Sequence, residues 1–220
     1  MKDALLCFRG LGESMNANML EGVKYKVDRN RYDIIEIPYS ATFGPIGSPD
    51  IFAKSLQASV DEAVRNAESF IFKYDHVALA GYSFGTLPVE ALIKKYPKGT
   101  PRGNKIMIGA TLASARRKPG RSFGMLMAED RGGILGGWND DSRLWCALAW
   151  PGDVVTSLPT DSLLRRAAPA IQYMSFSDLP AWARSLKAEL PRIVTNEIGT
   201  IWEHMFDPIW ARRYGEMLFE

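Results

Sequence analysis

The sequence is poor in metal-binding residues and in net charge. It holds only two cysteines and two histidines among 220 residues, and no cysteine lies near a histidine at a zinc-ligand spacing. We therefore expect neither a metal nor a cofactor. The formal net charge is only +2, whereas nucleic-acid-binding proteins usually carry a concentrated basic patch. Nucleic acid is therefore not an expected partner.

Long apolar runs are also absent. No segment approaches the ~18 apolar residues of a membrane span, so we expect no transmembrane segment. The apolar run at residues 4–8 is too short for the core of a signal peptide. We expect a protein made in the cytoplasm without its own signal peptide, which reaches the outside only if another agent lets it out.

The cysteines and the basic residues each have a simple interpretation. Cys7 and Cys146 both lie in apolar runs, which favours buried free thiols in a reducing compartment, with a disulfide between them as the alternative. The one short basic cluster consists of residues 116–118 together with the nearby Arg121. We expect it to be a solvated loop rather than a binding site for an acidic surface.

Apolar runs of strand length alternate with longer helical patterns along the chain. This alternation predicts a parallel sheet with helices on both faces, in one domain spanning residues 1–220. The glycine-rich stretch 110–141 is expected to be a functional loop or a disordered segment. The predicted strands are 4–8, 33–39, 76–80, 105–109 and 144–150, and the predicted helices are 15–28, one opened by residues 48–50, 84–96 and one opened near 177–180.

A nucleophile motif stands between a predicted strand and a predicted helix. Residues 81–85 read G-x-S-x-G, with the apolar run VALA before them and a helical pattern after them. A sharp strand-to-helix turn of this kind lifts a serine hydroxyl above the edge of a sheet. Ser83 is therefore the predicted nucleophile, and a turn with an incidental serine is the alternative.

A serine nucleophile needs a general base, and histidine is the usual one. His76 precedes Ser83 by seven residues on the same predicted strand, so it lies roughly 20 Å away, toward the other end of the sheet. His204 comes late in the chain, where the order of nucleophile, acid and base places a histidine. Elimination therefore favours His204, although a structural histidine is the alternative.

An acid that orients the imidazole must lie between Ser83 and His204. Asp153 follows the predicted strand 144–150 in a Pro-Gly turn, which places it at the sheet edge where ligands bind. We favour Asp153, while an aspartate that merely suits a turn is the alternative. The other candidates are Glu129, Asp130, Asp140, Asp141, Asp161 and Asp178.

Acyl transfer also needs N–H donors for the developing oxyanion. One is normally the main-chain N–H of the residue after the nucleophile, here Phe84. Another usually comes from a loop after an early strand, and Leu11, next to Gly10, lies in such a glycine-rich loop. An ordinary glycine-rich turn is the alternative for that loop.

Four motifs, taken in order, resemble a known family. RGLGES, IPYSATFGPIGS, GYSFGT and PGDVVT each follow a predicted strand. Together they resemble cutinase-like serine esterases, and most of all the lysin B esterases of mycobacteriophages. The resemblance covers nearly the whole chain and is weakest over residues 157–200. It implies an α/β-hydrolase fold of the cutinase-like type.

The resemblance also implies an activity and a set of roles. Lysin B enzymes hydrolyse the ester between mycolic acids and arabinogalactan in the mycobacterial envelope, which implies a lipid or glycolipid ester substrate and action at the host cell envelope during lysis. By motif, Ser83 is the nucleophile, Asp153 the acid and His204 the base, with Leu11 and Phe84 as oxyanion donors. Leu11 departs from the family, where threonine or serine is usual.

Two other functions remain open from the sequence. The same triad serves a carboxylesterase or lipase that acts on short or medium acyl esters. A catalytically inactive hydrolase fold used for binding is the second alternative. The apolar segment 123–127 is a candidate lid or acyl-contact loop, and packing of this segment into the core is equally compatible with its composition.

Overall fold

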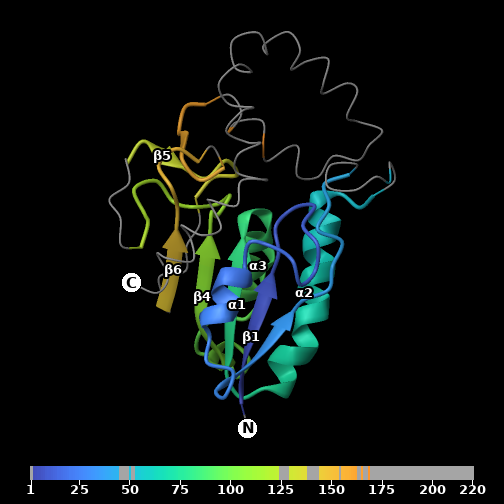
Figure 1. Cartoon of the computed structure of the whole chain (residues 1–220). Helices are drawn as coiled ribbons and strands as arrows, with labels where there is room; N and C mark the ends of the chain where they lie inside the picture. The colour runs from blue at the N-terminus through green and yellow to red at the C-terminus, as the bar shows by residue number, and fades with distance from the viewer. Residues whose placement is uncertain are drawn as a thin grey trace.

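A five-stranded parallel sheet forms the centre of the protein, with strand order β2-β1-β3-β4-β6 (Figure 1). The computed structural model describes residues 2–44, 50, 53–123, 129–137, 144–153, 155–162, 165 and 168. The strands of the sheet are β1 (Asp3–Phe8), β2 (Tyr32–Glu36), β3 (Val77–Tyr82), β4 (Ile106–Leu112) and β6 (Leu144–Leu148). A small antiparallel pair joins β5 (Arg131–Gly132) to β7 (Leu158–Pro159).

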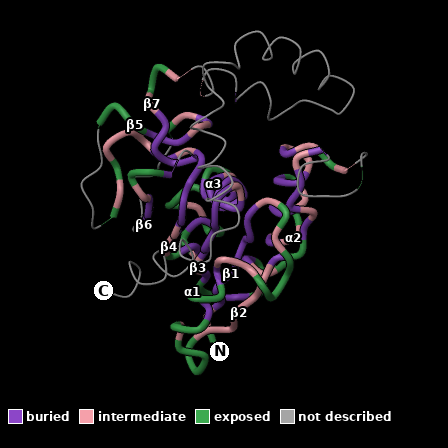
Figure 2. The backbone as a smooth tube through the Cα atoms, turned by 45° about the horizontal axis from the view of Figure 1, so that its top comes forward, coloured by how far each residue is buried: buried purple, intermediate pink, exposed green. Residues whose placement is uncertain are grey.

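Helices cover both faces of this sheet (Figure 1). Side chains alternate along a strand, so Leu6 and Phe8 of β1 pack into the core beneath α2 (Leu56–Lys73) and α3 (Thr86–Lys95). Leu5 and Cys7 instead pack beneath α1 (Glu21–Lys26). Figure 2 shows the buried strands at the centre. The predicted parallel sheet with helices on both faces is therefore confirmed. The helices are α1 (Glu21–Lys26), α2 (Leu56–Lys73), α3 (Thr86–Lys95) and the 3₁₀ turns η1 (Ser83–Gly85) and η2 (Gly103–Lys105).

The helix predicted over residues 15–28 is mostly wrong, because only α1 forms. Asn16 has a left-handed φ of 61°, which a continuous helix does not allow. Buried carboxylates compete for the main chain here: Glu36 accepts the Asn16 N–H at 2.9 Å, and Glu13 accepts the Met19 N–H at 2.8 Å. Tertiary hydrogen bonds therefore outweigh the local helical pattern in residues 14–20.

The second predicted helix begins later than its sequence pattern indicates. Ser55 caps α2, since its hydroxyl accepts the Ala58 N–H at 3.2 Å. The preceding main chain is used differently, because the Lys54 carbonyl accepts hydrogen bonds from the Gly44 N–H at 2.8 Å and the Thr42 hydroxyl at 3.0 Å. The helix start predicted at residues 48–50 is therefore wrong.

The remaining predicted elements are confirmed with shifted bounds where the structure describes them. Strand β4 continues to Leu112, so it takes up the first residues of the glycine-rich stretch 110–141. Strand β3 begins at Val77 and leaves His76 just outside it. The helix predicted after residues 177–180 lies outside the described residues.

Both cysteines are free and buried, as predicted. Burial raises the pKa of Cys7 to about 12 and that of Cys146 to about 11. They lie on β1 and β6, which are separated by two strands, and strands about 4.8 Å apart leave a separation too wide for a disulfide.

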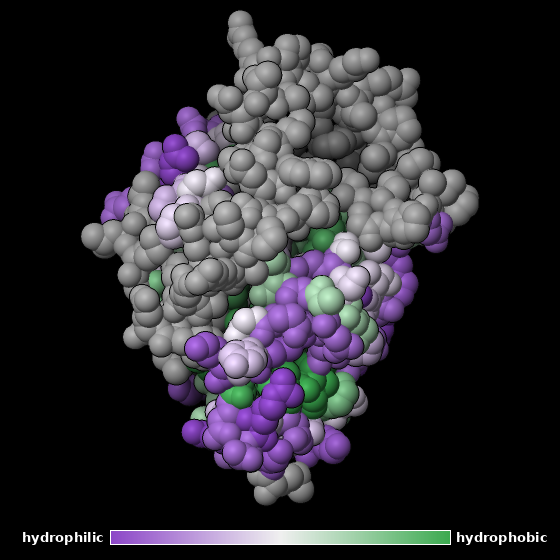
Figure 3. All heavy atoms as spheres, in the orientation of Figure 1, coloured by the Kyte–Doolittle hydropathy of each residue, from purple (hydrophilic) through white to green (hydrophobic). Residues whose placement is uncertain are grey.

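Hydrophilic residues predominate on the exposed part of the face shown in Figure 3. None of the helices in the described part of the chain is long and apolar enough to cross a membrane.

Candidate active site

Ser83 occupies a strained turn at the carboxyl end of β3. Its φ is 53°, in the left-handed region that side chains other than glycine rarely adopt. The serine is 4% exposed, and η1 begins at it and leads directly into α3. The Thr86 hydroxyl donates to the Ser83 carbonyl at 2.7 Å. Strand, sharp turn and helix follow in the order that the G-x-S-x-G motif predicts.

The two glycines of the motif are required by close main-chain contacts. A Cβ at Gly81 would lie closer than 3.0 Å to the Gly85 carbonyl and to Thr86. A Cβ at Gly85 would lie closer than 3.0 Å to the carbonyl groups of Phe8 and Arg9, just after β1. The turn is thus pressed against the end of β1, and only a residue without a side chain fits between them.

Replacing Gly85 by alanine is therefore expected to destabilise the protein by at least about 3 kcal/mol, since neither main chain can move without disturbing the sheet. Urea unfolding of the purified variant measures this loss. Gly152→Ala is the matched control, because its Cβ would meet only Trp150 at an ordinary 3.8 Å. Equal midpoints for Gly85→Ala and wild type would contradict the close packing.

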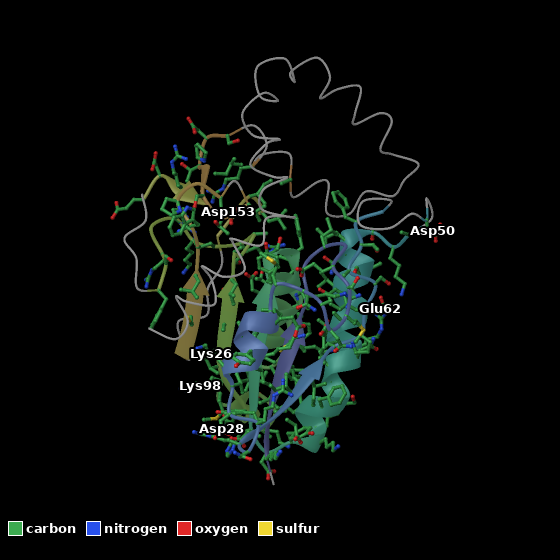
Figure 4. The ribbon with its side chains drawn as sticks, in the orientation of Figure 1. Lys26, Asp28, Asp50, Glu62, Lys98 and Asp153 are labelled. Atoms are coloured by element: carbon green, nitrogen blue, oxygen red, sulfur yellow. The ribbon has the colours of Figure 1, made fainter. Side chains whose placement is uncertain are left out.

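Asp153 is buried at the same edge of the sheet as Ser83. Tyr82, Leu112 and Leu148 stand in one row across β3, β4 and β6, and Ser83 directly follows the first of them. Asp153 lies beyond the arrowhead of β6 (Figure 4). The parallel strands thus bring the ends of β3 and β6 to one edge, two strand spacings or about 10 Å apart.

Donors from its own loop hold both oxygens of the Asp153 carboxylate. The Val155 N–H donates to Oδ1 at 2.9 Å and the Thr156 hydroxyl donates to Oδ2 at 2.9 Å. The Asp153 carbonyl also accepts the Ser157 N–H at 2.7 Å, which closes the turn. Asp153 is only 1% exposed, so its orientation is fixed by its own loop.

The alternative acids are placed less favourably where the structure describes them. Glu129, Asp130 and Asp161 are all exposed, so no packing fixes the orientation of their carboxylates. Asp140, Asp141 and Asp178 lie outside the described residues. Among the acid candidates in the described ranges, Asp153 alone is buried.

Of the two histidines, the structure describes His76. His76 precedes the first residue of β3, at the opposite end of the strand from Ser83, and its side chain is 54% exposed. Its Nδ1 lies 3.1 Å from a carboxylate oxygen of Asp3, which accounts for it structurally. His204 lies outside the described residues.

The loop predicted to supply an oxyanion donor adjoins the turn at Ser83. The Arg9 carbonyl borders Gly85, and a Cβ at Gly10 would lie 2.9 Å from the Tyr82 ring. Phe84 is the second residue of η1, where N–H groups have no partner within a helix. The Leu11 N–H forms no main-chain hydrogen bond with another residue in the described ranges.

Two charged side chains, Arg9 and Glu13, hold the loop that is predicted to supply an oxyanion donor. Arg9 is 7% exposed, stacks on the Tyr39 ring at 4.8 Å and donates from Nε to the Glu13 carbonyl at 2.7 Å. The Glu13 carboxylate accepts the N–H groups of Gly10 and Met19, and burial raises its pKa. The sequence offered one signal for these contacts, which is that Arg9 and Glu13 flank two glycines at a short spacing.

The prediction that residues 116–118 form a solvated loop is wrong for Arg117, which is fully buried. Its Nε donates to the Thr156 carbonyl at 2.9 Å, next to the loop that holds Asp153. Its two terminal nitrogens donate to the carbonyls of Lys118, Arg121 and Arg131. The guanidinium thus ties the segment after β4 to the loop that holds Asp153, because its planar fork can reach several carbonyls at once.

No group of three or more histidine, cysteine, aspartate or glutamate side chains suited to a metal ion occurs within the described ranges.

No protein-family model and no curated protein sequence matches the chain. Its structure is similar to that of lysin B from mycobacteriophage D29, with a TM-score of 0.63 and 17% identity over 100% of both chains. A cutinase-like protein from Cryptococcus sp. gives 0.50 and 14% identity over 81% of this chain and 94% of its own. The acetyl xylan esterase catalytic core of Trichoderma reesei gives 0.50 and 13% over 82% and 97%. These likenesses show that the chain has the α/β-hydrolase fold.

Proposed function

We propose that this protein is a serine esterase, with Ser83 as nucleophile, Asp153 as acid and His204 as base. The observation that carries the proposal is the turn at Ser83, where a strained serine stands between a parallel strand and a helix. Strain of this kind persists at functional sites because the surrounding structure holds it. The burial of Asp153 at the same edge of the sheet supports the second role.

The proposed reaction has two halves. The Ser83 hydroxyl attacks the ester carbonyl while His204 takes its proton, and the N–H groups of Leu11 and Phe84 stabilise the resulting oxyanion. Collapse breaks the ester bond, His204 returns the proton to the leaving alcohol, and the acyl group stays on Ser83. Water then attacks the acyl group by the same route and releases the acid and the free serine.

As substrate we propose the ester between mycolic acids and arabinogalactan, cleaved at the host cell envelope. This choice rests on the motif series of the sequence and on the likeness to lysin B, which spans both chains completely. A carboxylesterase for short acyl esters is the second candidate, favoured by the likeness to the cutinase-like protein. Both candidates take the whole chain as one catalytic domain.

The test combines three measurements on the purified protein. Wild type should hydrolyse p-nitrophenyl butyrate, a fluorophosphonate should label the peptide that contains Ser83, and purified mycolyl-arabinogalactan should yield free mycolic acids. Absence of both turnover and labelling would contradict the esterase and favour an inactive hydrolase fold. Short-ester turnover without release of mycolic acids would instead favour the second candidate.

A further inference from the structure

A series of hydrogen-bonded, buried polar side chains adjoins the turn at Ser83. Thr86 and Glu90 lie one turn apart on α3, and Ser114 follows β4; all three are at most 4% exposed. The Ser114 hydroxyl donates to Glu90 Oε1 at 2.9 Å, and the Thr86 and Ser114 hydroxyl oxygens lie 3.4 Å apart. Because Thr86 also donates to the Ser83 carbonyl, this series of side chains connects the buried carboxyl group of Glu90 to the main chain of the nucleophile.

Burial of the Glu90 side chain carries a large desolvation cost. Burial raises its pKa to about 8, against the lowering effects of the Ser114 hydroxyl and the Arg116 charge. Its Oε2 accepts no hydrogen bond from the described residues, and the Arg116 Nε lies 3.8 Å from it. A leucine or methionine would fill the same space without the desolvation cost, so packing alone does not account for a glutamate here.

We propose that Glu90 is a positioning residue for the nucleophile: through Ser114 and Thr86 it fixes the carbonyl of Ser83 and so maintains the strained turn. The proposal rests on the esterase function proposed above. The Ser114 hydroxyl has a single proton, which it gives to Glu90. Its lone pairs then remain for the main-chain N–H of Arg116 at 3.1 Å and for the Thr86 hydroxyl. The single Thr86 proton is shared, in a three-centre bond, between the Ser83 carbonyl at 2.7 Å and the Ser114 oxygen at 3.4 Å. Glu90 therefore holds the Ser114 hydroxyl in the orientation in which it accepts from Thr86.

The charged groups around Glu90 are few. Within the described part of the chain, Arg116 is the charged side chain that shifts its pKa, and the other contributor is the Ser114 hydroxyl. Ionisation of Glu90 strengthens its bond from Ser114, because hydrogen bonds to a charged acceptor are stronger. The turn should therefore respond to pH near 8, separately from the titration of the catalytic histidine.

The first test is kinetic, on the intact protein with p-nitrophenyl butyrate. Glu90→Leu and Thr86→Val should each lower kcat about 10-fold, with KM little changed, because a small displacement of a nucleophile slows the chemical step. Thr86→Ser should recover most of the rate. Glu90→Gln, which keeps an acceptor for Ser114 but cannot ionise, should remove the step near pH 8 from the profile of kcat. Titration of the active serine with a fluorophosphonate corrects for misfolded protein.

Thr111→Val is the matched control. It removes a fully buried hydroxyl from β4 that has no hydrogen-bond partner among the described residues, so kcat should stay at the wild-type value. Equal kcat for Glu90→Leu and an active wild type would overturn the positioning role and leave the esterase intact. An inactive wild type would overturn both proposals.

The second test follows stability and does not depend on turnover. The pKa of Glu90 in the folded protein, about 8, lies above its ordinary value of 4.5, so the folded state holds this proton more tightly. Its contribution is complete below pH 4.5 and is lost as the pH rises through 8. The urea midpoint of wild type should fall between pH 5 and 9 by more than that of Glu90→Gln. Parallel curves would show that Glu90 is not protonated in the folded protein and would overturn its role as a pH-responsive group.

Discussion

Replacing Ser83 by alanine is expected to lower kcat for ester hydrolysis by at least about 10⁴-fold. The residual rate would come from the oxyanion donors and from substrate binding alone. The folded state should be retained, because alanine removes one oxygen and keeps the contact between Gly85 and the end of β1. Initial rates with p-nitrophenyl butyrate, measured beside urea unfolding, separate the two effects.

The matched control for Ser83 is Ser69→Ala, which changes an exposed serine on α2. Its rate should equal that of wild type. Fluorophosphonate labelling should be lost in Ser83→Ala and retained in Ser69→Ala. If Ser83→Ala keeps the wild-type rate, the turn after β3 is structural and the nucleophile lies elsewhere.

Replacing Asp153 by asparagine is the second large expected effect, with a loss of about 10⁴-fold in kcat. A carboxylate can hold the imidazole in the tautomer that accepts the serine proton, whereas an amide favours the wrong one. Both oxygens of Asp153 already accept hydrogen bonds, from the Val155 N–H and the Thr156 hydroxyl. One of these donors would face the amide NH₂, which adds a stability loss of about 1 kcal/mol.

The kinetic loss and the stability loss for Asp153 are measured separately, by initial rates and by urea unfolding. Asp161→Asn serves as the control, because Asp161 is exposed and follows the short strand β7. More than about a tenth of wild-type activity in Asp153→Asn would exclude it as the acid. The search would then move to Asp140, Asp141 and Asp178.

The turn at Ser83 could be predicted because its signal is local. Residues 77–85 hold a buried strand, two small residues and the serine, and the same short segment forms the sharp turn. Asp153 could be predicted for a related reason, since in a parallel sheet the residue that follows a strand lies at a known edge. Neither prediction required knowledge of a contact between distant residues.

The failed predictions concern residues whose partners are distant in sequence. Residues 14–20 have a helical pattern, but the Asn16 N–H donates to the carboxylate of Glu36 on strand β2. Arg117 stands in a short basic run of the sequence, which is typical of a surface, yet its guanidinium donates to carbonyls as far away along the chain as that of Thr156. A periodic pattern records which side chains are apolar, and it does not record which buried acceptors the folded chain brings to a charged group.

By itself, the sequence determined the parallel sheet, the sharp turn at Ser83 and the sheet edge at which Asp153 lies, because strand periodicity and the needs of a tight turn are local properties. Only the tertiary structure decided that Arg117 is buried against the loop of Asp153 and that Glu90 lies behind Ser83. The reason is energetic. A charged or polar group can be buried only where hydrogen-bond partners from other segments compensate its desolvation, and those contacts form only when the chain folds.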